Sequence, residues 1–549
     1  MLPSVKRWTV LIIMCAAQFI MVLDTTVMNV SVSNVVEDLD TSLTTVQLAI
    51  TLYTLVMGSF MLLGGRLGDI FGRKKIFGIG LIVYGVGSMT TALSPNAGWL
   101  LFGWSFVEGA GAVMVMPAII SLTASNYSGR DRATAYGALG GIAAAGAAAG
   151  PLIGGWVTEA LTWRVVFAAE TLVCIVIVLL MSRIADAKSE ARGRIDWPGV
   201  AFSSLGLGLV VLAMLQAGSW GLFRPTGALT IAGHEITPFG YSVVPFMVLA
   251  GLLVLYGFFA WERRVIDRGG SPLMHPALLR KLQLRNGLVM LMAQQTVIGG
   301  MFFVIPIYLQ YVLLKDAFET GVKLAPMSIA MLIAAFSGPK LAETRSPRWI
   351  VTVGLALVAA GSVLLISTIN PELNDTLFAV GMAIFGAGFG LVASQLGNVI
   401  MSSVGDSDRG EAGGLQGTAQ NIGTSLGVAM IGAMLVASLS TGLDERAQQD
   451  PAISQSTKAA ISEVSAKGVD VVTSAEVSKA LANAGVSGAE ADAVVAAYES
   501  AQIDAIKDAI LLSAILALIG LLIAQRLPRV PGVELGAEDD RAPPAPANA

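Results

Sequence analysis

Long, nearly uncharged apolar runs constrain the fold of this chain more than any other feature. A helix needs about 20 mostly apolar residues to cross the hydrocarbon core of a bilayer. Only 13% of the 549 residues are charged, whereas a soluble domain has about a quarter of its residues charged. The chain is therefore predicted to be an all-α polytopic membrane protein. Fourteen candidate spans start near Trp8, Thr44, Ile76, Trp99, Ala133, Arg164, Pro198, Gly240, Asn286, Thr320, Trp349, Leu377, Gly410 and Lys507.

The distribution of basic residues orients these spans. Cytoplasmic loops collect Lys and Arg, and with the N-terminus inside, the inner loops and tails hold 25 of the 34 basic residues. This predicts an even number of spans, with both termini in the cytoplasm. We expect the membrane to be a bacterial plasma membrane. The first span is longer than the apolar region of a signal peptide, so we expect it to remain as a helix.

A sequence repeat divides the spans into two halves. RDRATAYGALGGIAAAGAAAG around the fifth span resembles SDRGEAGGLQGTAQNIGTSLG around the thirteenth. Chance matching of glycines is one explanation, but six identities at one offset favour duplication. Parallel repeats with the substrate site at their interface are a known transporter architecture. The matched residues, each pair 277 positions apart, are Asp131, Arg132, Gly137, Gly140, Gly146 and Gly150 with Asp408, Arg409, Gly414, Gly417, Gly423 and Gly427.

These observations predict that the chain forms two six-helix bundles with two extra spans between them. The expected segments are an N-terminal bundle at 1–195, two additional spans at 196–265, C-terminal helices at 266–440, an extracytoplasmic helical insert at 441–505, the last span at 506–527 and a disordered cytoplasmic tail at 528–549.

The insert is polar and rich in Ala and Ser. Residues 473–476 (TSAE) and 487–490 (SGAE) have the spacing of a capping box, which predicts two short helices at 474–484 and 488–505. The segment is either a flexible loop without function or an external cap or docking point, where an envelope partner is expected to bind.

Three carboxylates interrupt the apolar spans. Asp24 lies in LDTTVMNV, Glu108 in GWSFVEGAG and Glu170 in FAAETLV, and an acid in a span costs roughly 2.5–3.5 kcal/mol. With a rise of about 1.5 Å per residue, all three reach a comparable depth in the outer half of the bilayer. Such a cluster can bind protons or a cation in a hollow between the bundles and release them when it becomes wetter. The alternative is that one acid, Glu170 above all, pairs with Arg164 at the outer mouth.

The second half carries amides where the first carries acids. An amide in a span more often joins helices than contacts a substrate. One amide of the first span and three of the second half are nevertheless candidates for the lining of a substrate cavity, together with the acids: Asn29, and Gln294, Gln310 and Asn398.

Two further motifs point to conformational change. GRLGDIFGRKK at 65–75 is an ordinary basic inner loop or a conformational latch formed by Gly65, Asp69, Gly72, Arg73 and Lys74. Small residues allow close helix packing and proline bends a helix. GAAAGPLIGG in the fifth span is therefore either simple packing or a bent gating helix, with the candidate hinge residues Gly146, Gly150, Pro151, Gly154 and Gly155.

Other classes of site are not indicated. Cys15 and Cys174 fall in apolar runs, and His234 and His275 have no second ligand nearby, so neither a disulfide nor a metal site is expected. The chain has no Gly-Lys dipeptide and hence no Walker A lysine. We expect no cofactor and no nucleic-acid partner. We also expect no enzymatic activity, because the sequence shows no nucleophile–base pair.

Together these motifs resemble the major facilitator superfamily and, within it, the fourteen-span drug:proton antiporter family. Residues 65–75 resemble the superfamily's loop signature, 146–155 its antiporter motif, and 23–30 the first-helix motif of the fourteen-span family. The resemblance covers roughly residues 8–440 and 507–526. It implies a proton- or substrate-linked role for Asp24, a latch at Asp69 and Arg73, and a hinge at Gly150-Pro151.

The chain departs from the family pattern in the fourth and sixth spans. Where such antiporters carry Arg-x-x-Gln-Gly, this chain has Ser105-Phe-Val-Glu108-Gly109, and Glu170 replaces a common Asn. The site has lost a positive charge and gained two acids, which favours a more acidic cavity suited to cations or to several protons.

Three functions remain open from the sequence. The first is monomeric, proton-coupled export of a lipophilic, often cationic compound across the lipid bilayer. The second is export of an endogenous lipid, siderophore or envelope precursor, in which the insert meets an acceptor. The third, least favoured because acids in hydrocarbon are costly, is a membrane scaffold or sensor that transports nothing.

Overall fold

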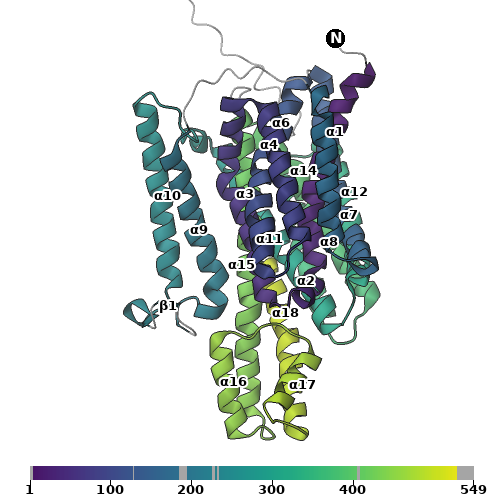
Figure 1. Cartoon of the computed structure of the whole chain (residues 1–549), viewed down its shortest axis with the longest axis vertical. Coiled ribbons are helices and arrows are strands. Elements are labelled where there is room, and N and C mark those ends of the chain that lie inside the picture. Colours follow the sequence, from purple (N-terminus) through teal and green to yellow (C-terminus); the bar gives the residue numbers. More distant parts are fainter. Residues whose placement is uncertain are drawn as a thin grey trace, which may run out of the picture.

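The computed structural model describes residues 4–127, 129–184, 195–225, 229–231, 234–404, 409–527 and 529. Over this part of the chain the protein is helical apart from one two-stranded hairpin. Thirteen helices are long and apolar enough to cross a membrane, and the bent helix α7 (Gly129–Ala160) makes the fourteenth. The prediction of an all-α polytopic fold is confirmed (Figure 1).

The N-terminal half contains six spans and three short elements beside them. Its elements are α1 (Ser4–Val30), α2 (Val32–Asp38), α3 (Leu43–Phe71), α4 (Arg73–Ala92), α5 (Ala97–Leu100), the π-helix η1 (Leu101–Glu108), α6 (Gly109–Asn126), α7, α8 (Arg164–Leu180) and η2 (Met181–Arg183).

Two further spans connect the halves. Their segment comprises α9 (Trp197–Trp220), β1 (Leu229–Ile231), β2 (His234–Ile236), η3 (Pro238–Gly240) and α10 (Val244–Asp267). The hairpin pairs β1 with β2 in antiparallel register. The helix α9 packs on α10, α3 and α15, so this pair covers the line where the two halves meet; Figure 1 shows it standing to one side of the bundle.

The C-terminal half repeats the six-span pattern and adds the insert. Its elements are η4 (Leu278–Arg280), α11 (Leu282–Ile307), the π-helix η5 (Tyr308–Val312), α12 (Ala317–Ala342), α13 (Pro347–Thr368), α14 (Asp375–Met401), α15 (Arg409–Gln449), α16 (Gln455–Lys467), α17 (Ser474–Asn483) and α18 (Ala489–Ala524).

Polar residues at the helix starts fix where many of these elements begin. A short polar side chain placed before an apolar run accepts a hydrogen bond from the otherwise unpaired backbone N–H groups of the first turn. Capping side chains of this kind precede α3, α5, α9, α12, α13 and α14, and they are Ser42, Asn96, Asp196, Asp316, Ser346 and Asn374.

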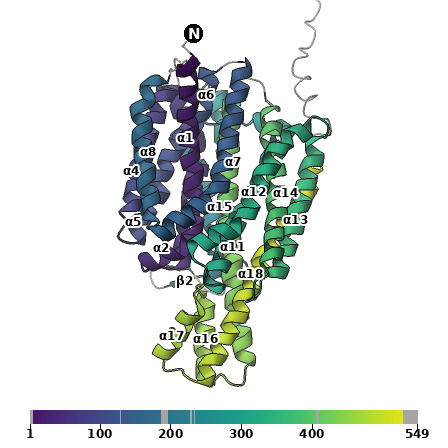
Figure 2. The ribbon, with the colours of Figure 1, turned by 90° about the vertical axis from the view of Figure 1, so that its right-hand side faces the viewer.

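The two halves have equivalent helix contacts. Within each half, α1 packs on α7 and α11 packs on α15; between the halves, α7 packs on α12 and α15 on α3. Figure 2 shows the two bundles side by side above the insert. This arrangement brings the two repeated glycine segments, in α7 and α15, to the interface of the halves.

The repeated glycines have equivalent surroundings in the two halves. Gly150 of α7 lies against α1, and Gly427 of α15 lies against α11. A Cβ at Gly150 would lie 1.8 Å from Thr26 Oγ1, and a Cβ at Gly427 would lie 2.1 Å from the Thr296 carbonyl oxygen. Neither approach leaves room for a side chain, so glycine is required at both positions. The 277-residue offset seen in the sequence therefore reflects a shared packing requirement.

The insert consists of the extensions of two spans, α15 and α18, with the short helices α16 and α17 between them. Helix α17 agrees with the predicted 474–484, and its capping box between Thr473 and Glu476 forms as expected. The predicted separate helix at 488–505 is wrong, because these residues belong to α18, which continues into the membrane. The second predicted box is wrong as well: Glu490 instead accepts hydrogen bonds from Ser454 N and Thr457 Oγ1.

Sequence patterns also missed part of the insert. Helix α16 was not expected, and α15 runs past the predicted boundary at 441 to Gln449. The Tyr498 hydroxyl accepts from Val472 N at 2.8 Å and donates to Val472 O at 2.9 Å, which fixes the link before α17 to α18. The segment is thus helical, as expected, and the alternative of a flexible loop is wrong.

Candidate functional site

The three acids found in the spans lie together in the structure. Asp24 comes from α1, Glu108 from the end of η1 and Glu170 from α8, and one carboxylate oxygen of each lies within 4.8 Å of those of the other two. Asp24 and Glu108 are fully buried and Glu170 is 2% exposed. We call this group the carboxyl cluster.

Close helix packing positions Glu108. A Cβ at Gly87 of α4 would lie 2.4 Å from the backbone nitrogen of Glu108, and a Cβ at Gly111 of α6 would lie 2.4 Å from that of Tyr84. The small residues therefore let α4 contact η1 and α6 backbone to backbone. The π-helical turn ending at Glu108 is of a kind often found at functional sites.

Neutral donors surround two of the acids. The Trp104 Nε1–H donates to both oxygens of Asp24, at 2.9 and 3.2 Å, and the Tyr53 ring stacks on Trp104 with centroids 4.9 Å apart. Ser88 Oγ donates to Glu170 Oε2 at 3.1 Å, and Tyr84 OH lies 3.5 Å from the same oxygen.

Glu108 has no such support. Neither of its carboxylate oxygens has a hydrogen-bond partner among the described residues, although both are buried. A buried charge without a partner is strongly unfavourable. Glu108 is therefore the member of the carboxyl cluster whose charge most needs a proton or a cation.

No basic side chain offsets these charges within the part of the chain that the structure describes. Arg164 pairs with Asp38 at 2.8 Å and donates to Ser94 O at 2.8 Å, so the alternative that it pairs with Glu170 is wrong. Ser105, which stands where the family carries arginine, donates its hydroxyl hydrogen to Ala49 O at 2.8 Å.

The cluster can therefore hold protons or a small hard cation. Three neighbouring carboxylates in an apolar interior cannot all be charged without compensation. Oxygen ligands at this spacing suit cations that prefer oxygen, although the sequence had indicated no metal site. Protons, which need no ligand geometry, satisfy the same requirement.

The cluster lies inside the N-terminal half, not in a hollow between the halves. Its surrounding side chains come from α1, α3, α4, η1 and α8, and the acids have almost no exposed surface. The expectation of a water-accessible hollow between the bundles does not hold in this conformation, because α3, α4 and α8 enclose the acids.

The candidate amides are scattered. Asn29 donates to Thr25 O within α1, and Gln294 donates to Phe389 O within the C-terminal half. Asn398 has an exposed side chain on α14. None of these joins the carboxyl cluster, and their assigned role in a cavity rests on the sequence alone.

Gln310 joins the two halves. Its Nε2 donates to Val30 O at 2.7 Å, and its Oε1 accepts from Ser33 N at 3.2 Å. A second such amide, Gln47, donates to Val428 O at 3.1 Å. Both contacts lie toward the insert end, since α3 begins at Leu43 and α15 continues into the insert. We call the contacts made by Gln310 and Gln47 the outer seal, because the orientation predicted from the sequence places the insert outside.

The insert takes part in the same closure. Thr44, at the start of α3, donates to Asp470 in the link between α16 and α17. Gly468 in that link lies against Ser219 near the end of α9. The insert therefore contacts both the N-terminal half and the additional helices at this end of the molecule.

The candidate latch surrounds a break between two helices. Gly72 separates α3 from α4 with φ 100° and ψ 128°, a backbone conformation that glycine adopts readily. Across the break, Arg73 Nη2 lies 3.2 Å from Asp69 Oδ1, and Lys74 Nζ donates to Ile184 O at 2.8 Å. Gly65 faces Pro117 of α6. These contacts are all within the N-terminal half.

The candidate hinge residues face two helices at once. Gly146, Gly150 and Gly154 lie against α1, whereas a Cβ at Gly155 would lie 2.3 Å from the Ala317 carbonyl of α12 in the other half. The Pro151 carbonyl oxygen comes equally close to Gly321 of α12. The helix bends by 41° between 141–147 and 149–160. This part of α7 is thus both bent and tightly packed across the interface of the halves.

Sequence reasoning missed the neutral partners of the acids. Tyr53, Tyr84, Ser88 and Trp104 supply the surroundings of the carboxyl cluster. The signal available in the sequence was weak: hydroxyl and indole groups inside spans, which are common wherever helices pack. Only their convergence on the acids distinguishes them.

Comparison with known proteins agrees with this architecture. A family model described as Major Facilitator Superfamily matches residues 14–428. The chain is 29% identical over 437 residues to the puromycin resistance protein of Streptomyces alboniger, covering 78% of this chain and 82% of that protein. It is 28% identical over 440 residues to a probable actinorhodin transporter of Streptomyces coelicolor, covering 79% and 73%.

A solved structure shares the fold. A bacterial homolog of the human lysosomal transporter Spinster, in an inward-facing and unoccupied conformation, aligns with a TM-score of 0.61 at 15% sequence identity. The alignment covers 99% of this chain and 100% of the other.

Proposed function

Because the chain belongs to the Major Facilitator Superfamily, we propose that this multi-pass membrane transporter is a proton-coupled exporter of lipophilic, cationic compounds, of the fourteen-span drug:proton antiporter kind. Its relatives include a puromycin resistance protein and a probable actinorhodin transporter, which supports drug export. The observation that carries the coupling is the carboxyl cluster, three buried acids with no basic partner among the described residues.

The exchange follows from charge balance. With the cluster enclosed, protons neutralise the acids. When the halves rock and water or a cationic compound reaches Asp24 or Glu108, the protons are displaced. A cation that leaves outward is replaced by protons that enter from outside, so the proton gradient drives export. The proposed orientation, with both termini in the cytoplasm, sets the direction.

Rocking requires the outer seal to open. Two amide contacts, from Gln310 and Gln47, and the insert contact between Thr44 and Asp470 close the insert end. The bent helix α7, at Gly150 and Pro151, and the turn at Gly72 are our candidates for the hinge and the latch.

Transport by the purified full-length protein in proteoliposomes tests the exchange. Puromycin, an amine, is the first probe because of the Streptomyces alboniger relative. We expect an imposed pH gradient to drive its movement, and Asp24→Asn to abolish the response. If the wild type moves puromycin at the same rate with and without the pH gradient, proton coupling is refuted. Export by a passive or ion-independent route would still be compatible with that result.

Export of an endogenous lipid or envelope precursor is the second candidate, favoured by the ordered insert. Arg446 of α15 contacts Asp504 of α18, so a short glycine linker can replace 445–503 without separating the two spans. Drug export is expected to survive this deletion. If the deletion variant keeps puromycin transport but its host loses an envelope component, the second candidate gains support.

A further inference from the structure

Two buried aromatic rings cover the carboxyl cluster at the insert end of the N-terminal half. Trp163, Phe167 and Glu170 follow one another at intervals of four and three residues, so they lie on one face at the start of α8. Trp163 and Phe167 are each 1% exposed, and their rings meet edge to face at 5.9 Å. Phe167 also lies edge to face with Trp104, the partner of Asp24. A proton that moves along this face toward Glu170 meets the two rings first.

An ion pair at the surface holds the outer ring in place. Trp163 Nε1 donates to Asp38 Oδ2 at 3.0 Å, and the Arg164 guanidinium lies over the Trp163 ring at 4.5 Å. Arg164 Nη2 lies 2.8 Å from the same Asp38 oxygen, and Arg164 Nη1 donates to Ser94 O, beyond the end of α4, at 2.8 Å. The Asp38 and Arg164 side chains are 45% and 26% exposed. We call Asp38, Trp163, Arg164 and Phe167 the aromatic lid.

The acid beneath the lid can accept a proton. Ser88 Oγ lies 3.0 Å from Phe167 O and 3.1 Å from Glu170 Oε2, so this serine of α4 joins the lid to the acid. Glu170 Oε1 is buried and has no hydrogen-bond partner among the described residues. The other titratable side chains beside the cluster in the described part of the chain are Tyr53, Tyr84 and Cys174. None of these is a carboxyl group, so Glu170 is the acceptor nearest to the lid along α8.

The helix that carries Asp38 is held at its other end by the opposite half. Helix α2 is a single short piece whose backbone hydrogen bonds continue from residue 31 to residue 39, and Figures 1 and 2 show it at the insert end. Gln310 of the outer seal donates to Val30 O and accepts from Ser33 N. Asp38 lies about 7.5 Å farther along the same helix. Helix α2 therefore connects the outer seal to the aromatic lid.

We propose that α2 couples the lid to the seal, so that protons from the insert side reach Glu170 only when the two halves separate at that end. With the seal closed, Gln310 fixes α2 and keeps Asp38 on Trp163 and Arg164. When Gln310 releases α2, Asp38 withdraws, Trp163 loses its hydrogen bond, and the ring turns aside. The inference rests on the proposed function, because it assigns the regulation of proton entry to the same cluster. It makes Asp38, Trp163 and Arg164 positioning residues.

Proton uptake by the full-length protein without substrate tests the coupling. The protein is reconstituted in a single orientation on a solid-supported membrane, where a pH jump gives a displacement current as buried acids take up protons. Asp38→Asn weakens the pair with Arg164, and we expect uptake from the insert side to become about fivefold faster, as for the loss of a partly exposed ion pair. Gln310→Met is expected to act similarly. Uptake from the opposite side is expected to stay unchanged, whereas a generally destabilised protein would change on both sides and overturn the inference.

The double variant distinguishes coupling from two independent effects. Because both substitutions release the same helix, Asp38→Asn combined with Gln310→Met is expected to speed uptake no more than either change alone. Independent effects would multiply to about 25-fold. A multiplied effect, or an unchanged rate in Asp38→Asn, would overturn the inference.

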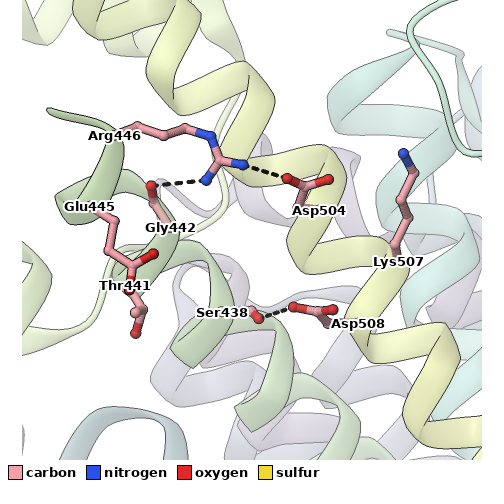
Figure 3. Close-up of a pocket in the computed structure, with 8 residues that line it drawn as sticks. All are labelled: Ser438, Thr441, Gly442, Glu445, Arg446, Asp504, Lys507 and Asp508. Atoms are coloured by element: carbon pink, nitrogen blue, oxygen red, sulfur yellow. Dashed lines mark hydrogen bonds and ion pairs between the residues drawn. The ribbon is translucent and has the colours of Figure 1, made fainter. Parts of the chain in front are cut away.

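Asp504→Asn is the matched control. It removes another partly exposed pair of an aspartate and an arginine, Asp504 with Arg446, which joins α15 to α18 at the base of the insert (Figure 3). This pair contacts neither α2 nor the lid, so we expect uptake to stay at the wild-type rate. Equally fast uptake in Asp504→Asn and Asp38→Asn would mean that loss of any ion pair at this end is sufficient, and the inference would be wrong.

A variant without the acids separates this inference from the proposed function. Asp24→Asn, Glu108→Gln and Glu170→Gln together are expected to abolish the displacement current. If the current remains, the carboxyl cluster is not the proton site, and the proposed function fails together with the lid. If the current is lost there but Asp38→Asn behaves as the wild type does, only the coupling through α2 is wrong.

Discussion

The two halves of the molecule use the same helix contacts but differ in the chemistry they place there. In the N-terminal half, a Cβ at Gly87 would meet the backbone nitrogen of Glu108 at 2.4 Å; in the C-terminal half, a Cβ at Gly361 would meet that of Phe385 at 2.6 Å. The first contact joins α4 to η1 and the second joins α13 to α14. A buried acid in one half thus corresponds to a buried phenylalanine in the other.

The same correspondence holds for Asp24. It lies two residues before Thr26, the neighbour of Gly150, whereas Gln294 lies two residues before Thr296, the neighbour of Gly427. Gln294 donates to a backbone carbonyl and needs no counter-charge. The fold therefore tolerates neutral residues at these positions, and the acids of the N-terminal half are not a structural requirement.

The largest effect is expected from removing the charge that distinguishes the halves. Asp24→Asn changes little in shape, and we expect gradient-driven export in proteoliposomes to fall about a hundredfold, as when a proton-transfer group is lost. Gln294→Met, the corresponding change in the C-terminal half, is expected to leave the pH dependence of export unchanged even if the rate falls. If export by the Gln294→Met variant loses its pH dependence, both halves take part in proton coupling. The proposed difference between the halves is then wrong.

The next largest effect is a gain in stability, whereas the first was a loss of export. Glu108→Leu gives the N-terminal half an apolar residue where the C-terminal half has Phe385. Since Glu108 has no hydrogen-bond partner among the described residues, we expect the free energy of unfolding to rise by about 1–4 kcal/mol while coupled export is lost. Thermal unfolding in detergent measures the first and proteoliposome transport the second. Phe385→Leu, the corresponding change in the C-terminal half, is the control. If Glu108→Leu unfolds at a lower temperature than the wild type, the acid stabilises the fold and the prediction is wrong.

Much of the fold could be predicted from the sequence, because spans are long and their signals are strong. The predicted starts of most spans lie within four residues of the observed helix starts. The close packing of Gly150 and Gly427 accounts for the repeat at an offset of 277 residues. The insert is less predictable, because α18 continues from polar to apolar residues without a break in helical structure. The change in composition at 505 therefore resembles a helix end, although the helix continues.

The site was predictable in part. Asp24, Glu108 and Glu170 stand out because acids in spans are rare, and comparable depth suggested that they meet. Their surroundings were not predictable, since Trp104 and Tyr53 are ordinary residues of an apolar span. Nor can the sequence identify the ion-pair partner of Arg164, because Asp38 lies outside the spans and no sequence pattern relates it to α8.

A third prediction compares the two glycines. Gly150→Ala places a methyl group against the Thr26 hydroxyl, and Gly427→Ala places one against the Thr296 backbone carbonyl. Overpacking costs about 1–3 kcal/mol, and we expect the Gly427 variant to lie at the upper end because a backbone atom cannot rotate away. Adding Thr26→Ala is expected to restore part of the stability of Gly150→Ala. Thr296→Ala is not expected to help Gly427→Ala, and rescue there would contradict the proposed contact.

The smallest effect concerns the contacts that each half makes with the other. Gln310 of the C-terminal half bonds to Val30 O, and Gln47 of the N-terminal half bonds to Val428 O. Replacing either by Met removes about 1 kcal/mol of hydrogen bonding, which shifts the population of the form open at the insert end about fivefold. Spin labels at Glu37 and Glu372, both exposed, report that opening as a longer distance.

The control is an amide that bonds within its own half. Gln395 donates to Gly338 O, and both belong to the C-terminal half, so Gln395→Met is expected to leave the label distances unchanged while costing similar stability. The two seal variants should also act alike, since each removes one bond from the same closure. If Gln310→Met opens the insert end and Gln47→Met does not, the halves do not contribute equally to the outer seal. If neither opens it, the insert contact between Thr44 and Asp470 holds the closed form by itself.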